Sequence, residues 1–409
     1  MKFLLTVFFF SCGIAVSGQN IFNSPYSVYG LGIMNSRLST LNRGMGGTGI
    51  AVRDGYNLNY VNPASYGSIV SPVSSIFEMG FYIEHSSYNT NELSESKTNG
   101  SLTNMNYWFK FSPKWSSTVG LSPFSSVSYK INSTRTLGSV QNIDYTYEGN
   151  GNISQVYWGN AFSILKNLSF GLNISYLFGT VSKTESIDIL SQASSLVFEN
   201  KINTNKINLD AGMQYVIPFK KNRSLVVGIV GDNGIDFKAS QKNYLYDGSA
   251  DTLATSTGKS LKYKLPASVG IGLALHSTRS IIASDLKFES WGSLDFHEVD
   301  VEAHDTWKFS AGYLYRGNPD ATHYLGAVSL RAGVHLQNYH LQIKENSFSW
   351  WGFTAGASMP MFDNRSSINI TYSFDQLGTL TNGLILQRSH QFMVDVVIRD
   401  LWGGKRKFD

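Results

Sequence analysis

The pattern of hydrophobic and polar positions along the chain becomes regular near residue 74. From there, runs of about ten residues place a large apolar side chain at every second position and a small or polar one between. A period of two is the period of a β-strand whose two faces meet different surroundings. In the run at 168–178, Leu172 and Tyr176 lie on the apolar face and Asn173 on the other. The same division recurs at 207–217, 367–374 and 391–399.

The lengths of the connections decide between two all-β architectures. A soluble sandwich and a membrane barrel both contain alternating strands, but short turns on one side and long loops on the other are typical of a barrel. About 14 strands fit the sequence, and one longer connection, 317–326, falls on the short-turn side. Residues 71–409 are therefore predicted to form a transmembrane antiparallel β-barrel. Tight turns are expected near 112–113, 166–167, 220–222, 277–278 and 363–364, and long polar loops at 89–100, 183–201 and 238–260.

Composition agrees with a barrel and argues against membrane helices. Only 15% of the residues are charged, whereas soluble domains have about 25%. Beyond the N-terminus no stretch reaches the roughly 18 apolar residues that a membrane helix needs. These features predict a bacterial outer-membrane protein in contact with lipid and lipopolysaccharide. Aromatic rings favour the headgroup level, and candidates for such a girdle are Trp108, Trp115, Trp158, Tyr176, Trp291, Trp307, Trp350, Trp351 and Trp402.

Residues 1–18 are predicted to be a signal peptide. Lys2 precedes an apolar stretch at 3–10, and small residues lead to a cleavage site after Gly18. The alternative is a lipoprotein signal in which Cys12, the one cysteine, is acylated and kept. After cleavage at Gly18 the chain has no thiol, which excludes disulfides. The net charge of +4 is too small to indicate a nucleic-acid partner.

The segment 19–70 has a different composition, rich in Gly, Asn, Ser and Tyr, and it does not alternate. It contains G-x-G-x-x-G at Gly44, Gly46 and Gly49. In a dinucleotide-binding fold this motif follows a strand and opens a helix. That context is missing in an all-β chain, so no nucleotide cofactor is expected. The other interpretation is a compact plug whose glycines allow close backbone packing and positive φ.

A family resemblance rests on this segment. The string from Gly44 to Ala51, then Asp54, then the run 59–66 resembles the N-terminal hatch of the FadL family of outer-membrane transporters for hydrophobic compounds. Similar stretches at 265–272, 306–313 and 330–334 extend the resemblance over nearly the whole mature chain, and 400–408 resembles the branch found in Bacteroidota. The resemblance implies a hatch over 19–70 that gates the barrel through Gly44, Gly46, Gly47, Gly49, Asn62, Pro63 and Ala64.

The resemblance has limits that concern the substrate. The opening at 24–30 differs from that of the fatty-acid carriers. Ligand-contacting residues of those carriers have no counterpart that can be matched position by position. The identity of the solute therefore does not carry over.

Motifs for catalysis or metal binding are absent from the sequence. It contains no H-E-x-x-H, C-x-x-C or G-x-S-x-G, and its eight histidines are dispersed. A barrel lipase would have to use a Ser/His pair, for which His335 and His390 are the best candidates. We expect no enzyme and no cofactor. Asp285, Lys287 and Glu289 share one face of one predicted strand, where they form either a mutually neutralising ladder or part of a permeation path. The lumen-facing polar candidates are Asp285, Lys287, Glu289, Arg331 and His335.

Two functions follow from these observations. The first is passive uptake of a hydrophobic small-molecule ligand by a monomeric barrel, which the resemblance implies. If the chain behaves as that family does, the solute leaves sideways through a break in the wall. The second is a non-transporting scaffold that binds a partner in a secretion or surface-assembly complex. An open lumen pocket favours the first function, and a lumen filled by side chains favours the second.

Overall fold

The structure is a computed structural model that describes most of the chain. The predicted signal peptide with Cys12, the predicted turn at 363–364, Trp402 and the C-terminal basic residues lie outside the described part. The described residues are 24–70, 72–137, 141–189, 194–247, 251–258, 261–293, 301–343, 345–361 and 365–400.

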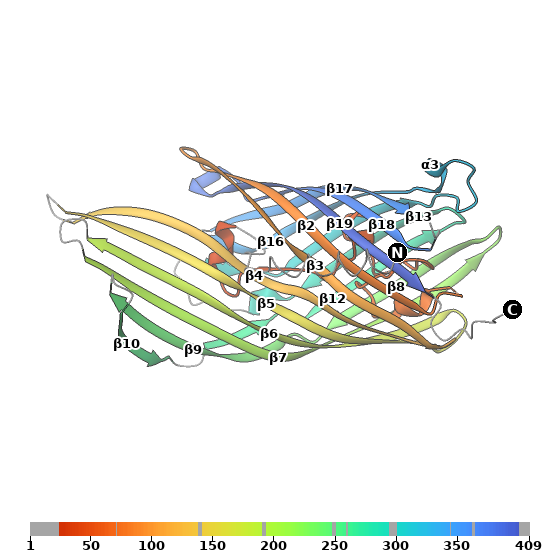
Figure 1. Cartoon of the computed structure of the whole chain (residues 1–409), viewed down its shortest axis with the longest axis horizontal. Coiled ribbons are helices and arrows are strands. Elements are labelled where there is room, and N and C mark those ends of the chain that lie inside the picture. The colour runs from red at the N-terminus through yellow and green to blue at the C-terminus, as the bar shows by residue number, and fades with distance from the viewer. Residues whose placement is uncertain are drawn as a thin grey trace, which may run out of the picture.

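One antiparallel sheet closes on itself to form a barrel (Figure 1). Closure comes from pairing of the last strand with the first, in register from Leu386 opposite Asn89 to Asp400 opposite Ser75. The wall has 14 strands, because β8 continues as β9 and β11 continues as β12. This confirms the predicted fold class. The wall strands are β2 (Ser75–Asn89), β3 (Ser94–Ser112), β4 (Trp115–Leu137), β5 (Gln141–Ser163), β6 (Leu168–Ile189), β7 (Ser194–Phe219), β8 (Arg223–Asp232), β9 (Ile235–Asp247), β11 (Leu261–Leu265), β12 (Ser268–His276), β13 (Ser280–Glu289), β15 (Thr306–Tyr315), β16 (Ser329–Ile343), β17 (Asn346–Pro360), β18 (Ser367–Leu377) and β19 (Leu386–Asp400).

Short elements complete the described chain. They lie before the barrel and in its connections. They are η2 (Pro25–Val28), β1 (Ile33–Met34), α2 (Thr40–Arg43), η3 (Pro63–Ser68), β10 (Thr252–Thr257), η4 (Trp291–Ser293), β14 (Val301–Ala303), α3 (Tyr324–Ala327) and η5 (Thr381–Gly383). No helix in the described ranges combines the length and hydropathy needed to cross a membrane.

The two faces of the wall strands differ as their alternation predicts. On β19, Phe392 and Val394 are exposed on the outside, whereas Gln391 and Asp395 are buried on the inside. On β6, Asn173 is buried and Tyr176 is exposed. An apolar outer surface around a polar lumen is the arrangement of a membrane barrel.

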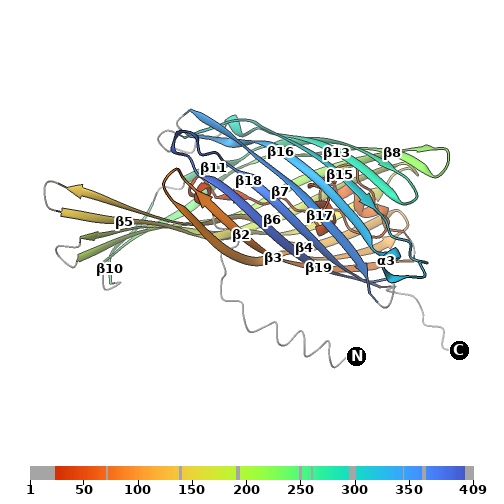
Figure 2. The same ribbon diagram turned by 90° about the horizontal axis from the view of Figure 1, so that it is seen from above.

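The predicted long polar loops are mostly strands, which corrects the sequence-based expectation. Residues 183–189 extend β6, residues 194–201 begin β7, and residues 94–100 begin β3. Serine, threonine and charged side chains tolerate a strand that is exposed to water, so polarity alone did not distinguish it from a loop. The extensions of β6 and β7, together with β4, β5, β9 and β10, form a wall that projects beyond the rest of the barrel (Figure 2).

A seam interrupts the wall between β3 and β4. Their pairing runs from Ser112 opposite Trp115 only as far as Met105 opposite Leu121. Beyond it, the pairing of β4 with β5 has an irregular register near Pro123. The free edge of β4 is then partly covered by β1, in which Ile33 pairs with Ser126.

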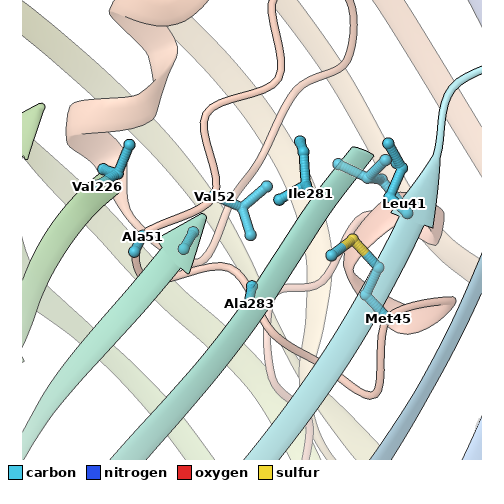
Figure 3. Packing of buried hydrophobic residues seen from close by; sticks show 9 residues of the cluster. Leu41, Met45, Ala51, Val52, Val226, Ile281 and Ala283 are labelled. Atoms are coloured by element: carbon cyan, nitrogen blue, oxygen red, sulfur yellow. The ribbon is translucent and has the colours of Figure 1, made fainter. Parts of the chain in front are cut away.

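Residues 24–70, which we call the plug, lie inside the barrel. One cluster joins Leu41, Met45 and Val52 of the plug to Ile281 on β13 and Val226 on β8. Figure 3 shows these side chains meeting between the plug and the inner wall. Burial of this apolar surface fixes the plug against several strands at once.

The predicted aromatic girdle is wrong at three positions. Trp108 is fully buried and its indole N–H donates to the Tyr66 carbonyl of the plug, 3.1 Å away. Trp291 is also buried, and the indole of Trp350 donates to Asp375 Oδ1 at 3.0 Å. Each of these rings faces inward, where its indole N–H has a polar partner on the plug or on the wall. The rings that are exposed on the outside are Trp115, Trp158, Tyr176, Trp307 and Trp351.

Candidate functional site

The glycine string of the plug lies directly against the wall. Gly46 has φ +69° and approaches Val334 so closely that an added Cβ would lie 2.5 Å from its carbonyl oxygen. Gly47 has φ +85°. The Gly46 amide donates to Thr354 Oγ1 on β17 at 2.9 Å. Gly44 and Gly49 are also buried, so the four predicted glycines form one compact turn beside the wall.

Asp285 holds the end of this turn. One of its carboxylate oxygens accepts the amides of Gly49, at 2.6 Å, and of Ile50, at 2.9 Å. A carboxylate that accepts two backbone N–H groups is a strong anchor because the bonds are charge-assisted. The sequence predicted that Asp285 faces the lumen, but it did not indicate this partner.

The Asn-Pro-Ala triplet forms the second attachment. Asn62 caps η3 by accepting the Ala64 amide at 3.0 Å, and Pro63 occupies the first turn. The Asn62 amide group donates to the Ile50 carbonyl at 2.7 Å. The triplet lies on two glycines of the wall, since a Cβ at Gly171 would meet the Pro63 backbone at 2.2 Å and one at Gly212 would meet the Asn62 side chain at 2.1 Å. These contacts make the triplet a rigid packing element.

The other predicted lumen residues do not form a single site. Lys287 and Glu289 pair at 2.8 Å, but Asp285 faces the plug instead of joining their ladder. His335 Nε2 lies 3.0 Å from Asp375 Oδ1. Arg331 is buried and donates to Ser358 Oγ at 2.7 Å. The described residues contain no group of three or more His, Cys, Asp or Glu side chains placed to hold a metal ion.

Several plug anchors escaped the sequence analysis. Arg37 pairs with Asp210 on β7 at 2.6 Å. Arg53 donates to Ser169 and Gln214 at 3.0 and 3.1 Å. No local signal distinguishes these arginines from solvated ones, because their partners are far away along the chain.

A loop of the plug that includes residues 54–57 is tied to the wall by charges. Arg316 lies 3.3 Å from Asp54, and Arg399 donates to the Tyr56 carbonyl and to Asn57, both at 2.6 Å. Burial would raise the pKa of the Asp54 carboxyl, but Arg316, Asn57 and the Tyr56 amide together hold that pKa below its usual range. Because the pKa is lowered on folding, the carboxylate stabilises the loop at neutral pH, and this stabilisation is lost as the pH falls through the lowered value.

Acid should therefore loosen this loop. In planar bilayers we expect brief ion-conducting openings that become more frequent as the pH falls below the usual titration range of an aspartate, because the lowered pKa of the Asp54 carboxyl delays its protonation to such pH values. The variant Asp54→Asn should show such openings at neutral pH, roughly tenfold more often than the intact protein, because a charge-assisted contact is lost. Asp320→Asn, at an exposed acid, is the matched control. A pH response that is unchanged in Asp54→Asn would contradict the assignment.

The part of the lumen around Tyr26 and Leu31 is apolar, and these side chains of the plug fill it. Tyr26 packs among Tyr339, Leu341 and Phe348, and its hydroxyl donates to the Ile385 carbonyl at 2.6 Å. On the opposite side Leu31 is buried in a second cluster. The wall residues of that cluster are Val127, Ile153, Leu177, Val181, Ile202, Ala239 and Leu265.

A cavity of about 370 Å³ remains inside the barrel. Part of its lining is apolar, including Met34 and Phe124, but charged side chains surround much of it. A hydrocarbon in this cavity would meet apolar side chains and also charged groups that would lose contact with water. The charged residues of the lining are Arg37, Arg43, Glu84, Asp210, Asp232, Asp285, Lys287, Glu289, Lys308 and Asp375.

Comparison with solved structures finds proteins of similar fold. A FadL homologue from Pseudomonas aeruginosa superposes with a TM-score of 0.63 at 12% identity, covering 89% of this chain and 98% of that one. The toluene transporter TodX from P. putida gives 0.58 at 17% identity, with 88% and 97% covered. The monoaromatic hydrocarbon channel CymD gives 0.58 at 14% identity, with 89% and 97% covered. At these identities the comparison establishes a FadL-like barrel fold.

The family itself follows from the whole chain. The family model described as BamG matches residues 1–409, so the chain belongs to the BamG family. No curated protein matches it.

Proposed function

We propose that this protein is a closed barrel of the bacterial outer membrane that acts as a scaffold in a secretion or surface-assembly complex. The observation that carries the proposal is that the plug fills the apolar part of the lumen around Tyr26 and Leu31. A hydrophobic solute would need the apolar surface that Tyr26 and Leu31 already cover. The BamG family assignment is compatible with a role of this kind.

Two further features support the scaffold. Charged side chains form part of the lining of the remaining cavity, and a hydrocarbon bound beside them would cost those groups contact with water. The projecting wall of β4–β7, β9 and β10 offers a large surface beyond the barrel. A barrel that only conducts solutes has no need of such a wall.

Uptake of hydrophobic small molecules is the second candidate function. The seam between β3 and β4 favours it, because the wall lacks strand pairing there beside the cavity-lining Phe124. The fold shared with hydrophobic-compound channels also favours it. In that case the glycine turn and the Asn62-Pro63-Ala64 triplet would act as a gate.

Native mass spectrometry distinguishes the two functions. The protein should be extracted from its own membrane in mild detergent, and we expect it to carry at least one other protein at fixed stoichiometry. In parallel, liposomes that contain the purified protein should take up laurate and toluene no faster than empty liposomes. The variant Tyr26→Ala, which uncovers apolar lumen surface, serves as the comparison for uptake.

The opposite result would favour transport. A barrel that is monomeric in its native extract, carries bound lipid or hydrocarbon, and speeds laurate or toluene uptake would overturn the scaffold.

A further inference from the structure

The edge of β4 that faces away from β5 binds the plug over residues 124–128. The Phe124 carbonyl accepts the Asn35 amide at 2.8 Å, and the Ser128 carbonyl accepts the Ser24 amide at 3.0 Å. Between them β1 pairs with Ser125 and Ser126. An extended segment of the plug thus adds to this edge as a strand would.

From Ser128 towards the C-terminal end of β4, the same edge continues without a partner among the described residues. In a strand, the N–H and C=O groups of alternate residues point to the same side. The positions that continue the row of Phe124 and Ser128 are Lys130, Asn132 and Thr134. The residues between them, Ile131 and Ser133, face β5, where they lie opposite Tyr147 and Tyr145. No described residue pairs with the outward groups of Lys130, Asn132 and Thr134.

The inner face beside this edge begins with apolar and aromatic side chains. One row across the wall contains Ile131 and Tyr147 nearest the edge, then Glu185 and Phe198, and Ile131 is 40% exposed. The next row contains Ile187 and Leu196. A row with Tyr129, Gly149, Lys183 and Asn200 separates them from the row of Val127, Val181 and Ile202, which share a cluster with Leu31 of the plug.

The outer face of the same strands is polar. Lys130 pairs with Glu148, and Thr134 donates to Asp144 at 2.7 Å. Unpaired edges are usually shortened, bulged or covered, because they invite another strand. Here an edge without a partner among the described residues adjoins Ile131 and Tyr147, and the plug already pairs with the preceding residues of the same edge.

We propose that the β4 edge from Lys130 to Thr134 binds an extended segment of a protein partner by strand addition. The inference rests on the proposed scaffold function and specifies its contact. The occupant has an apolar side chain that packs on Ile131 and Tyr147, the two residues of that row nearest the edge, as Leu31 of the plug packs on Val127. A carboxylate on that segment would meet Arg135, which lies on the same face over the Tyr145 ring at 5.3 Å.

Hydrogen exchange resolved to single residues tests this contact directly. The probe is the complex extracted from the native membrane, compared with the barrel purified alone. In the complex, the amides of Lys130, Asn132 and Thr134 should exchange at least about tenfold more slowly than in the barrel alone. The amides of Ile131 and Ser133, which already face β5, should not change. Alternate protection is specific to strand addition, because a partner that merely covers the face would not produce it.

Proline variants give an independent readout. Asn132→Pro and Thr134→Pro remove one outward N–H each and leave the bonds to β5 in place. The matched controls Asn132→Ala and Thr134→Ala lose the same side-chain contacts but keep the amide. We expect the double proline variant to lose the partner at least about tenfold more readily than the double alanine variant.

Each outcome has a distinct meaning. An intact complex without protection at these three amides would overturn strand addition and leave the scaffold function standing. A complex that consists of two copies of this chain would overturn the assignment of the occupant. A barrel that carries no partner in any native extract would remove the scaffold function itself.

Discussion

Replacing Ile370 by arginine should destabilise the barrel by about 2–4 kcal/mol. Ile370 lies on the outer face of β18 and is 40% exposed, next to Ile368 and Tyr372 on the same face. A guanidinium group at this depth must leave water for hydrocarbon, and no partner is available to compensate for the lost hydration. The free energy of unfolding, measured by urea titration in lipid vesicles, gives the cost.

Gln376→Arg is the matched control for this variant. Gln376 lies on the same strand and the same face but near its end, where it accepts a hydrogen bond from Arg388 at 3.1 Å. The cost there should be below about 1 kcal/mol, because the interface tolerates arginine. Equal costs at the two positions would mean that the outer face of β18 does not lie in a membrane.

The strand faces were predictable because a period of two is a local property of the sequence. Leu172 and Asn173 are adjacent, and their opposite environments follow from the pleat alone. The number of strands followed from the same pattern and the turn positions. The projecting wall was missed because its strands are polar on one face, and a hydrated strand differs little in composition from a loop.

The plug contacts could not be derived in the same way. Asp285 accepts the Gly49 amide across 236 positions, and nothing near either residue encodes that distance. Asn173 illustrates the consequence, because its sequence context suggests a tolerant lumen position. It is fully buried, accepts the Tyr66 hydroxyl at 3.2 Å and donates to Asp210 at 2.6 Å. A large residue at Asn173 would displace the plug.

Removal of the plug should convert a closed barrel into an open one. We expect a chain lacking residues 24–66 to assemble, because each wall strand pairs with its two neighbours and lumen-facing side chains can bind water instead of the plug. In planar bilayers the shortened protein should show large, stable conductance steps, and the intact protein should show none. Heat-modifiable gel mobility checks that the barrel has folded.

Asp285→Ala should give an intermediate result. The substitution leaves the Gly49 and Ile50 amides buried without their acceptor, at a cost of about 1–3 kcal/mol for each. The plug should then detach transiently, so that short conductance events become more frequent than in the intact protein. Glu302→Ala, at an exposed acid on β14, should conduct no more often than the intact protein. If the deletion prevents assembly, the plug is a folding element. If the shortened barrel folds and does not conduct, other parts of the chain close the lumen and the plug is not its seal.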